Sequence, residues 1–555
     1  MSEQTGRLEG HGGHHVLAAA RRHGVDTVFT LSGAHVFPVY DAATTSRPPT
    51  RLVDVRHEQT AVFAAEGTAK LTRRPGFAVL TAGPGVTNGV SAVTTAYFNG
   101  SPVVVLGGRA PQYRWGSGSL QELDHVPLLA PVTKAATTLT DPARIAAGMD
   151  AAFRTALAPH RGPVFVDVPM DVLFTPAQED LPDAVAPAPV EPDDAAVAAA
   201  AHELAGAHHP VLVLGSDVWT GGAEDAAVRL VEELGLPVVA NGMGRGLLRR
   251  DHERLVTRAR SAAFGRADVV VVVGTPLDFR LGYGVFGGKD GAPAAHVVHV
   301  TDDPVQLATH TELAAGVAGD LTRCLDALRE AVTAAGGTRP EVAGWASELR
   351  DAARAAVASD AELLASSSDP IHPARVYGEL VPRLADDAVV IGDGGDFVSF
   401  AGRFVEPNQP GGWLDPGPYG CLGTGAGYAA AARLARPSAQ VVLLLGDGAA
   451  GFSLMDVDTL VRHRLPVVMV VGNNGAWGLE KHPMRMLYGY DVVADLDQHT
   501  RYDDVVKALG GAGETVKDPA DLGPALDRAF AAGVPYLVNV LTDPEQAYPR
   551  STTGI

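Results

Sequence analysis

The stretch Val441-Val442-Leu443-Leu444-Leu445-Gly446-Asp447-Gly448 is an apolar run that ends in a glycine turn carrying a carboxylate. A second apolar run, residues 467–471, leads in the same way into Asn473-Asn474. We expect two neighbouring parallel strands, connected through a helix over 452–464, that deliver both polar side chains to one carboxyl edge of a sheet. Hard oxygen ligands beside a glycine turn suit a small dication that holds a diphosphate.

The spacing of this unit resembles the thiamine diphosphate signature, in which Gly-Asp-Gly is followed after about two dozen residues by Asn-Asn. Here residues 449–472 separate the two motifs. One helix and one strand fill such a gap, so the spacing has a mechanical cause. Gly392-Asp393-Gly394 also follows an apolar run, but no Asn-Asn lies at the right distance after it. We therefore expect an ordinary turn at that second triplet.

Composition limits the partners and the location. The chain has 555 residues, 44 Lys and Arg against 64 Asp and Glu, and a net charge of −20. This balance argues against nucleic acid or an anionic membrane as a partner, because both need basic surface. Two cysteines suit a reducing interior rather than a disulfide framework. With no apolar leader segment and no apolar window long enough to span a bilayer, we expect a cytoplasmic protein.

Alternating strand and helix patterns predict an α/β protein with three doubly wound parallel-sheet domains. We expect domains at 1–178, 195–335 and 370–545, with a tail at 546–555 that either closes over the substrate or frays. The stretch Thr175–Asp194 is rich in Pro, Ala and acid and reads as a linker. The first and third segments share a coarse layout. Strands are expected at 27–31, 78–81, 103–106, 164–168, 211–214, 238–240, 269–273 and 297–300.

Motifs near the N-terminus extend the resemblance. Arg56-His57-Glu58-Gln59 precedes a helical pattern over 60–72, and Thr81-Ala82-Gly83-Pro84-Gly85-Val86-Thr87-Asn88 follows. These motifs are similar to the pyrimidine-binding domain of the acetolactate synthase and oxalyl-CoA decarboxylase superfamily. The resemblance covers essentially the whole chain, in the order pyrimidine-binding, central and diphosphate-binding domain. It implies that Glu58 hydrogen-bonds N1′ of the aminopyrimidine.

The chemistry of thiamine needs such a carboxyl group. Thiamine acts only after its thiazolium C2–H loses a proton, and a carboxyl that donates to N1′ favours the imino tautomer that accepts this proton. Partial burial lets a glutamate carry a proton at neutral pH. Taken alone, Glu58 also fits a glutamate placed at a helix N-terminus by the macrodipole. The Gly83-Pro84-Gly85 turn and the 446–474 unit favour the cofactor role.

The resemblance implies further contacts with the cofactor. Leu422 would support its V shape, and the Gly420 carbonyl would accept its 4′-amino group, although a simple strand-to-helix glycine turn also explains this segment. Magnesium prefers six oxygen ligands, so Asp447, Asn474 and the Ala476 carbonyl would be completed by two diphosphate oxygens and a water. Other residues expected at the cofactor are Gly395, Asp396, Phe397, Gly446, Gly448, Ala449, Trp477 and Gly478. Ala449 stands where the family often has Ser, so one hydroxyl contact is lost.

Cofactor sites of this superfamily form between subunits, so the resemblance implies at least a homodimer, often a homotetramer. Its members hold ADP or FAD in the central domain. We expect ADP here and keep FAD as the alternative, with 274–284 lining either site. Three arginines would meet phosphates there, or only surface carboxylates, which is the commoner fate of arginine: Arg258, Arg260 and Arg280.

The substrate is suggested by other segments. Residues 32–41 look like acetolactate synthase, whereas 414–420, 451–456 and 508–513 look like oxalyl-CoA decarboxylase and 2-hydroxyacyl-CoA lyase. Beyond Asn474, acetolactate synthases usually show Met-Val and then Trp, but this chain has Leu479-Glu480 and Pro483. The chain therefore looks most like the actinobacterial 2-hydroxyacyl-CoA lyases, which release formyl-CoA and a ketone or aldehyde.

Two residues are expected to act on an acyl-CoA substrate. Glu480 would serve as general base for a substrate hydroxyl, or it is a solvated helix residue paired with Lys481, His482 or Arg485. Gln121 aligns with a substrate-side hydrogen bonder, and Leu120 replaces the Tyr typical of oxalyl-CoA decarboxylases. The sequence thus predicts a magnesium- and thiamine diphosphate-dependent lyase. The alternatives are an acetolactate synthase-like carboligase acting on pyruvate and a catalytically silent subunit.

A cluster of histidines, His11-Gly12-Gly13-His14-His15, raises the question of a metal. Its spacing is irregular, and it has no nearby cysteine or acidic partner. We therefore interpret it as the start of a helix.

Overall fold

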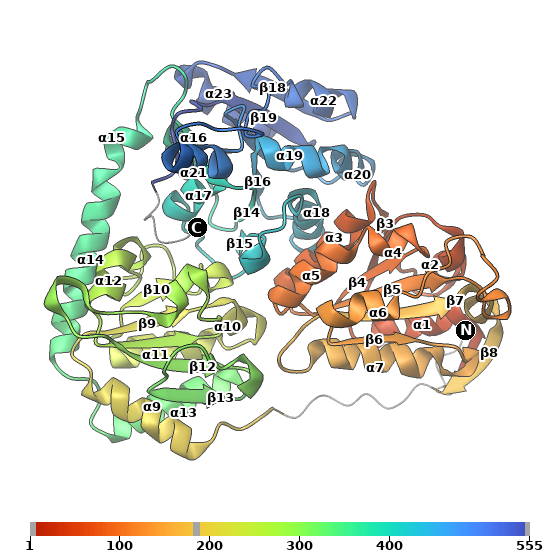
Figure 1. The fold of residues 1–555 in the computed structure, drawn as a ribbon, viewed down its shortest axis with the longest axis horizontal. Helices are drawn as coiled ribbons and strands as arrows, with labels where there is room; N and C mark the ends of the chain where they lie inside the picture. The colour runs from red at the N-terminus through yellow and green to blue at the C-terminus, as the bar shows by residue number, and fades with distance from the viewer. Residues whose placement is uncertain (1–6, 181–188, 550–555) are drawn as a thin grey trace.

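The computed structural model describes residues 7–180 and 189–549. Each of three α/β domains is built on a parallel sheet covered by helices, with the first domain at the right, the central domain at the lower left and the third at the top (Figure 1). This architecture confirms the predicted fold class. Within the described residues, no helix is both long enough and apolar enough to cross a membrane.

The first and third sheets have the same strand order, which confirms the shared layout. The first sheet runs β3-β2-β4-β5-β7-β6 and the third β15-β14-β16-β17-β19-β18, so each follows the order 2-1-3-4-6-5 in its own strands. The strands of the first sheet are β2 (Thr27–Thr30), β3 (Arg51–Asp54), β4 (Gly76–Leu80), β5 (Val103–Arg109), β6 (Ala135–Thr138) and β7 (Val164–Pro169). Those of the third are β14 (Val389–Asp393), β15 (Trp413–Leu414), β16 (Val441–Gly446), β17 (Val468–Asn473), β18 (Ala512–Val516) and β19 (Tyr536–Leu541).

The central sheet has the order β10-β9-β11-β12-β13. Its strands are β9 (Pro210–Leu214), β10 (Val238–Ala240), β11 (Val269–Val273), β12 (His296–Thr301) and β13 (Ala315–Ala318). All five valines of β11 are buried because helices cover both faces of a parallel sheet. A separate two-stranded ribbon joins β1 (Arg7–His11) to β8 (Pro176–Asp180). The linker predicted over Thr175–Asp194 is therefore wrong at Pro176–Asp180, because these residues form a paired strand.

The first and third domains contact each other through helices at equivalent places in the two sheets. Helix α3 (Glu58–Thr72) follows the second strand of the first sheet, and α18 (Gly425–Ala435) follows the second strand of the third. They pack together closely because Gly67 has no side chain, and a Cβ there would lie 2.9 Å from the Ala431 Cβ. Nearby, the Tyr428 hydroxyl donates a 2.8 Å hydrogen bond to the fully buried Glu66.

One predicted helix differs in position. The sequence predicts a helix over 452–464, whereas α19 (Asp447–Ser453) begins directly after β16, a short 3-10 turn follows, and α20 spans Val457–Arg462. The chain turns into a helix at once because Gly446 is still extended and serves as the N-cap of α19. Asp447 therefore stands at the very start of a helix rather than in a loop before it.

Candidate functional site

Asp447 lies where β16 and β17 end side by side. The two strands are paired in parallel, with Gly446 opposite Gly472, so the predicted neighbouring strands are confirmed. The Asp447 carboxylate is buried and accepts backbone N–H groups from Gly475 at 2.7 Å and Gly448 at 3.0 Å. Burial raises the pKa of Asp447 to about 6, and no cationic side chain in the described part of the chain pairs with it. A buried carboxylate without a cationic partner is suited to bind a metal cation.

A cavity of about 170 Å³ opens beside this carboxylate. It brings together every residue predicted at the diphosphate end of the cofactor. The lining residues are Gly395, Asp396, Phe397, Gly420, Leu422, Gly446, Asp447, Gly448, Ala449, Gly472, Asn474, Ala476, Trp477, Gly478, Leu479 and Glu480. The roles assigned to these residues stay predictions, but their convergence on one cavity is a property of the fold.

Three helices begin at this cavity. They are α17 (Asp396–Phe404), α19 and α21 (Gly478–Tyr488), and none of their N-caps makes a side-chain hydrogen bond. Free backbone N–H groups and the positive ends of helix dipoles favour a bound anion. A diphosphate with a dication held by Asp447 fits this donor set.

Missing side chains shape the cavity. A Cβ at Gly448 would lie 2.4 Å from the Trp477 ring, and a Cβ at Gly394 would lie 2.7 Å from the Ala449 Cβ. These two glycines therefore allow close packing around the turn that carries Asp447. A Cβ at Gly446 or Gly420 would instead meet nothing within 4 Å, so both positions leave open space for a ligand.

Asp393 does more than form the ordinary turn expected at Gly392-Asp393-Gly394. Its side chain is fully buried at the end of β14 and accepts N–H groups from Gly423 at 3.0 Å and Gly425 at 2.8 Å. It thereby fixes the turn that carries Gly420 and Leu422 to the cavity. The signal was present, because Gly392-Asp393-Gly394 ends an apolar run just as the signature triplet does.

Glu58 and Gln121 lie in the first domain, at a second group of predicted site residues. Glu58 begins α3, is 8% exposed, and accepts a 3.0 Å hydrogen bond from the Asn88 amide. Its other oxygen lies 3.8 Å from the position of a Cβ on Gly85, and Gln121 packs against Gly83. Neither Glu58 nor Gln121 is among the residues that line the Asp447 cavity.

The start of α3 is tied to the third domain through Asp456. This buried carboxylate accepts the Arg56 backbone N–H and the Thr60 hydroxyl, both at 2.7 Å. The two hydrogen bonds bracket Glu58 in the sequence. Asp456 therefore positions the Glu58 turn, a role that only the folded chain could show.

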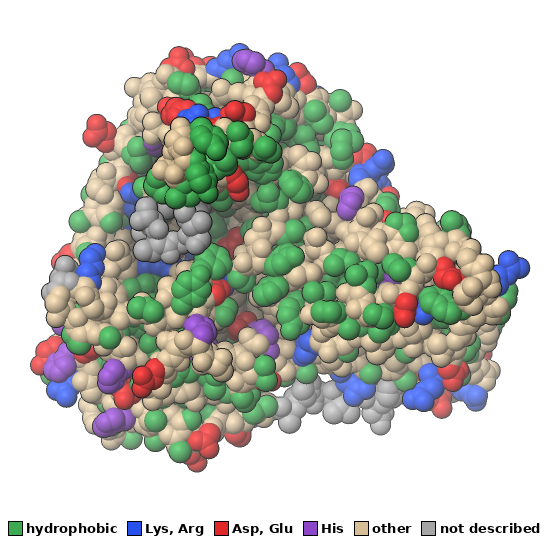
Figure 2. All heavy atoms as spheres, in the orientation of Figure 1, with side chains coloured by type: hydrophobic (Ala, Val, Ile, Leu, Met, Phe, Trp, Pro, Cys, Tyr) green, Lys and Arg blue, Asp and Glu red, His purple; other side chains and the backbone are tan. Residues whose placement is uncertain are grey.

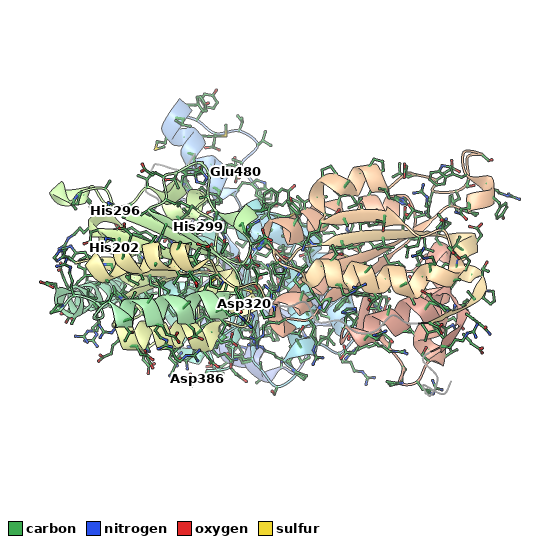
Figure 3. The ribbon with its side chains drawn as sticks, turned by 90° about the horizontal axis from the view of Figure 1, so that it is seen from below. His202, His296, His299, Asp320, Asp386 and Glu480 are labelled. Carbon is green, nitrogen blue, oxygen red and sulfur yellow. The ribbon has the colours of Figure 1, made fainter. Side chains whose placement is uncertain are left out.

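Glu480 stands on the first turn of α21, exposed to solvent at the edge of the cavity (Figure 3). Its neighbours on α21 form other ion pairs, Lys481 with Asp495 and Arg485 with Glu545. The described residues offer Glu480 no ion pair of its own, so it is not held by the bases proposed as its partners. This geometry leaves the carboxylate available to a ligand in the cavity.

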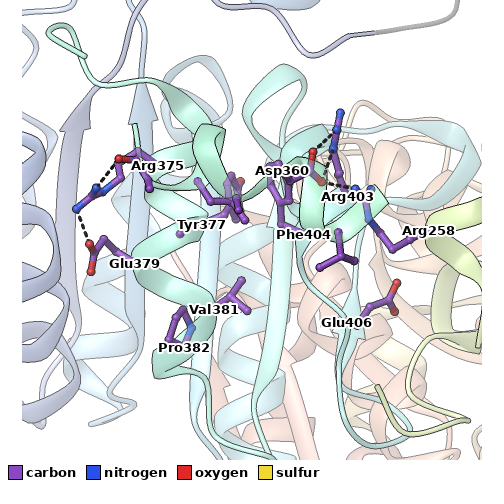
Figure 4. Close-up of a pocket in the computed structure, with 15 residues that line it drawn as sticks. Arg258, Asp360, Arg375, Tyr377, Glu379, Val381, Pro382, Arg403, Phe404 and Glu406 are labelled. Carbon is purple, nitrogen blue, oxygen red and sulfur yellow. Dashed lines mark hydrogen bonds and ion pairs between the residues drawn. The ribbon is translucent and has the colours of Figure 1, made fainter. Parts of the chain in front are cut away.

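The central-domain arginines meet other groups of the protein rather than open space. Arg258 and Arg403 both bind Asp360 in the pocket between the central and third domains (Figure 4). Arg280 pairs with Asp278 at 2.7 Å, and Arg260 donates to the backbone carbonyl of Arg280. The structure thus agrees with the commoner of the two expected fates for Arg258 and Arg280.

The described end of the chain docks next to the cavity. The Tyr548 backbone N–H donates to both oxygens of Asp396, and its ring packs edge-on against Phe400 at 5.1 Å. The rest of the predicted lid, residues 550–555, lies outside the described residues.

Comparison with known proteins agrees with this geometry. Three family models match, described as the N-terminal TPP binding domain, the central domain and the C-terminal TPP binding domain of thiamine pyrophosphate enzymes. They cover residues 10–128, 197–328 and 393–540, respectively. The matched segments contain Glu58, the central sheet and the Asp447 cavity.

Individual relatives fall into two groups. The chain is 52% identical over 543 residues, 97% of each protein, to the acetolactate synthase large subunit IlvG of Mycobacterium tuberculosis. It is 34% identical over 545 residues to 2-hydroxyacyl-CoA lyase 2 of Homo sapiens, covering 91% of this chain and 84% of the relative. The 2-hydroxyacyl-CoA lyase 2 of Caenorhabditis elegans is 33% identical over 552 residues, with 92% and 85% covered.

Proposed function

Because this chain belongs to the family of thiamine pyrophosphate enzymes, we propose that it is a magnesium-dependent carboligase that joins two molecules of pyruvate to acetolactate with loss of carbon dioxide. The observation that carries this choice is its higher identity, over nearly the full length, with a protein named as acetolactate synthase than with the lyases. The order of preference is therefore the reverse of that suggested by the residues after Asn474.

The cofactor would be held between two sets of residues. Thiamine diphosphate, when bound, supplies a thiazolium carbon that becomes a nucleophile once its proton is removed. Asp447, Asn474 and the Ala476 carbonyl would bind the dication, and the three helix N-termini would bind the diphosphate. Glu58 would hold a proton against N1′ of the pyrimidine. The Asn88 amide donates to one Glu58 oxygen and leaves the other free for that contact.

Two variants test the cofactor assignment. Glu58→Gln keeps a hydrogen-bond donor but cannot exchange its proton, so turnover should fall by about 10²–10⁴-fold. Asp447→Asn should weaken the joint binding of magnesium and thiamine diphosphate. The measurement is a thermal unfolding scan with and without both ligands, since a ligand that binds the folded state raises the melting temperature. If neither ligand raises it in the unmodified protein, the chain is instead a silent subunit.

A second candidate is cleavage of a 2-hydroxyacyl-CoA into formyl-CoA and a ketone or aldehyde. Glu480 favours it, because a free carboxylate at the cavity edge is placed to take the proton of a substrate hydroxyl. Purified protein should be supplied separately with pyruvate and with 2-hydroxyisobutyryl-CoA. Acetolactate in the first mixture supports the carboligase, whereas formyl-CoA in the second alone would replace it with the lyase.

We keep ADP, rather than FAD, as the proposed central-domain nucleotide.

We further propose that the working unit is at least a homodimer, and that a homotetramer is its expected form. The Asp447 cavity is small beside ligand pockets of about 300–1,000 Å³, and Glu58 does not line it. Hydrophobic side chains also gather on the face that includes α5 (Val90–Phe98) and α21 (Figure 2). Among them, Phe98 is 52% exposed and stacks on Tyr419. A second copy would cover this surface and place its own Glu58 beside the Asp447 cavity.

Subunit complementation tests this sharing. Glu58→Gln and Asp447→Asn variants are each expected to be inactive. If one subunit gives Glu58 and the other Asp447, co-expressed variants form mixed dimers with one intact site, and about a quarter of wild-type activity returns. If both residues of a site came from one chain, no mixture would regain activity.

A further inference from the structure

The histidine cluster at the N-terminus is divided by the fold into two parts. His15 is fully buried, and its Nδ1 lies 2.9 Å from the Glu179 carboxylate on β8. His11 and His14 instead lie together at the start of α1 (Gly12–Arg22), with ring centroids 4.2 Å apart. The predicted helix start is confirmed, but it accounts for only part of the motif.

The fold also brings an acidic residue to this pair from the following helix. Asp41 lies on α2 (Phe37–Thr45), and one of its oxygens is 2.9 Å from the Nε2 of His11. On the next turn of α2, the Thr45 hydroxyl lies 3.3 Å from the Nε2 of His14. One atom each from His11, His14 and Asp41 lie within 4.8 Å of one another.

Glycines set this arrangement. A Cβ at Gly13 would lie 2.0 Å from the Pro38 carbonyl oxygen, so only glycine lets α1 approach α2 closely enough to place Asp41 against the histidines. Gly10 has a φ of +141°, and a Cβ there would lie 2.8 Å from the His14 ring. The backbone of His11 is fixed in turn by pairing with Pro176 of β8. The three side chains thus come from backbone segments that are already held in place.

We infer that His11, His14 and Asp41 form a binding site for a divalent transition-metal cation of the zinc class, outside the cofactor cavity. Two imidazole nitrogens and one carboxylate oxygen are ligands that zinc accepts in four-coordinate sites, with water as the fourth. Imidazole ligands favour such ions over magnesium or calcium, which prefer oxygen. The site shares no residue with the Asp447 cavity and does not depend on the proposed activity.

The chemistry of the surroundings supports a cation. The ion pairs of the described residues place no lysine or arginine on Asp41, whose only partner there is His11. The Asp41 side chain is 57% exposed and that of His11 is 21% exposed, so an ion from solvent can reach them. A bound ion would connect β1, α1 and α2 and stabilise the first domain.

Zinc binding to the full-length protein tests the site. The protein is first saturated with thiamine diphosphate and magnesium, so that the Asp447 turn is filled, and is then titrated calorimetrically with zinc chloride. His14→Gln and Asp41→Asn should each bind one equivalent less than the wild type. His296→Gln is the matched control, because His296 is another exposed histidine paired with a carboxylate, Glu203, on the central domain (Figure 3).

The outcomes are distinct. Loss of one equivalent in both variants, with wild-type stoichiometry in the control, supports the site. Equal stoichiometry in the wild type and Asp41→Asn overturns it. Asp41 is largely exposed, so this variant keeps the test valid even if His14→Gln folds poorly. Cobalt provides a second readout, since a four-coordinate site gives visible absorption bands that should vanish in Asp41→Asn.

Discussion

Replacing Asp393 with asparagine should weaken thiamine diphosphate binding, although Asp393 lies beneath the cavity and does not line it. The carboxylate accepts two backbone N–H groups, from Gly423 and Gly425. Asparagine has nearly the same volume but only one acceptor atom. Its NH₂ group would face one of these N–H donors, so that hydrogen bond is lost and the other no longer involves a charge. The turn that carries Leu422 should then loosen.

The size of the effect follows from these contacts. A hydrogen bond to a charged group contributes about 1.5–3 kcal/mol, and an unpaired buried N–H costs about 1–3 kcal/mol. Burial raises the pKa of Asp393 to about 6, so part of this gain is offset by the cost of burying the charge. We expect the ordered turn to lose about 2 kcal/mol of stability. If the cofactor binds only the ordered turn, this loss corresponds to about 30-fold weaker cofactor binding.

The assay is a titration of cofactor-free protein with thiamine diphosphate at fixed magnesium, followed by fluorescence, because Trp477 lines the cavity. Asp268→Asn provides the control. Asp268 accepts the backbone N–H groups of His208 at 2.7 Å and His209 at 2.9 Å, but in the central domain. It should lose stability without losing cofactor affinity. Wild-type affinity in Asp393→Asn, with a comparable loss of stability in both variants, would refute the positioning role.

Three further predictions concern other parts of the molecule. If the chain cleaves a 2-hydroxyacyl-CoA, Glu480→Gln should lower kcat of that cleavage by about 10²-fold or more while leaving the thiamine diphosphate Kd unchanged; an unaltered kcat for the cleavage removes its assigned role. Gly448→Ala should weaken cofactor binding in the same titration, because the new Cβ would lie 2.4 Å from the Trp477 ring, an overpacking that costs about 1–3 kcal/mol. Burial disfavours the imidazolium of His160, but the hydrogen bond to Asp302 and the negative charges of Asp217 and Asp302 together outweigh it and raise the pKa of His160. This contact between the first and central domains should therefore be strongest below about pH 6.5 and weaken as pH rises through the higher folded-state pKa. Denaturant unfolding across pH should show that slope in the wild type and a flatter one in His160→Gln.

The sequence could predict the diphosphate half of the site because its residues follow consecutive buried strands. Once β16 and β17 are recognised as parallel neighbours, Asp447 and Asn474 must reach the same edge. The edge strands were harder to predict. β3 reads Arg-Leu-Val-Asp and β6 reads Ala-Ala-Thr-Thr, and both are only partly buried, so neither shows a long apolar run.

Contacts between residues that lie far apart in the chain could not be predicted from the sequence. Asp456 lies 400 residues from Arg56, and Asp41 lies 30 from His11. No local pattern connects such pairs, because the contact exists only after helices from different segments pack together. The same reason explains Asp393, which looked like a simple turn until its acceptor role at Gly423 and Gly425 was visible.

The equal strand order of the first and third sheets gives a physical argument for the proposed division of the cofactor site between two subunits. In both domains a glycine turn follows the third strand in chain order, at Gly83 after β4 and at Asp447 after β16. In both, the helix after the second strand forms the contact with the other domain, since α3 packs against α18. The two domains thus use equivalent helices to bind each other, and each keeps its own glycine turn at its own sheet edge. Within one chain this leaves Glu58 and the Asp447 cavity as separate halves. A second copy that presents its first domain to this cavity would complete the site without any change in either fold, and the complementation experiment measures that arrangement.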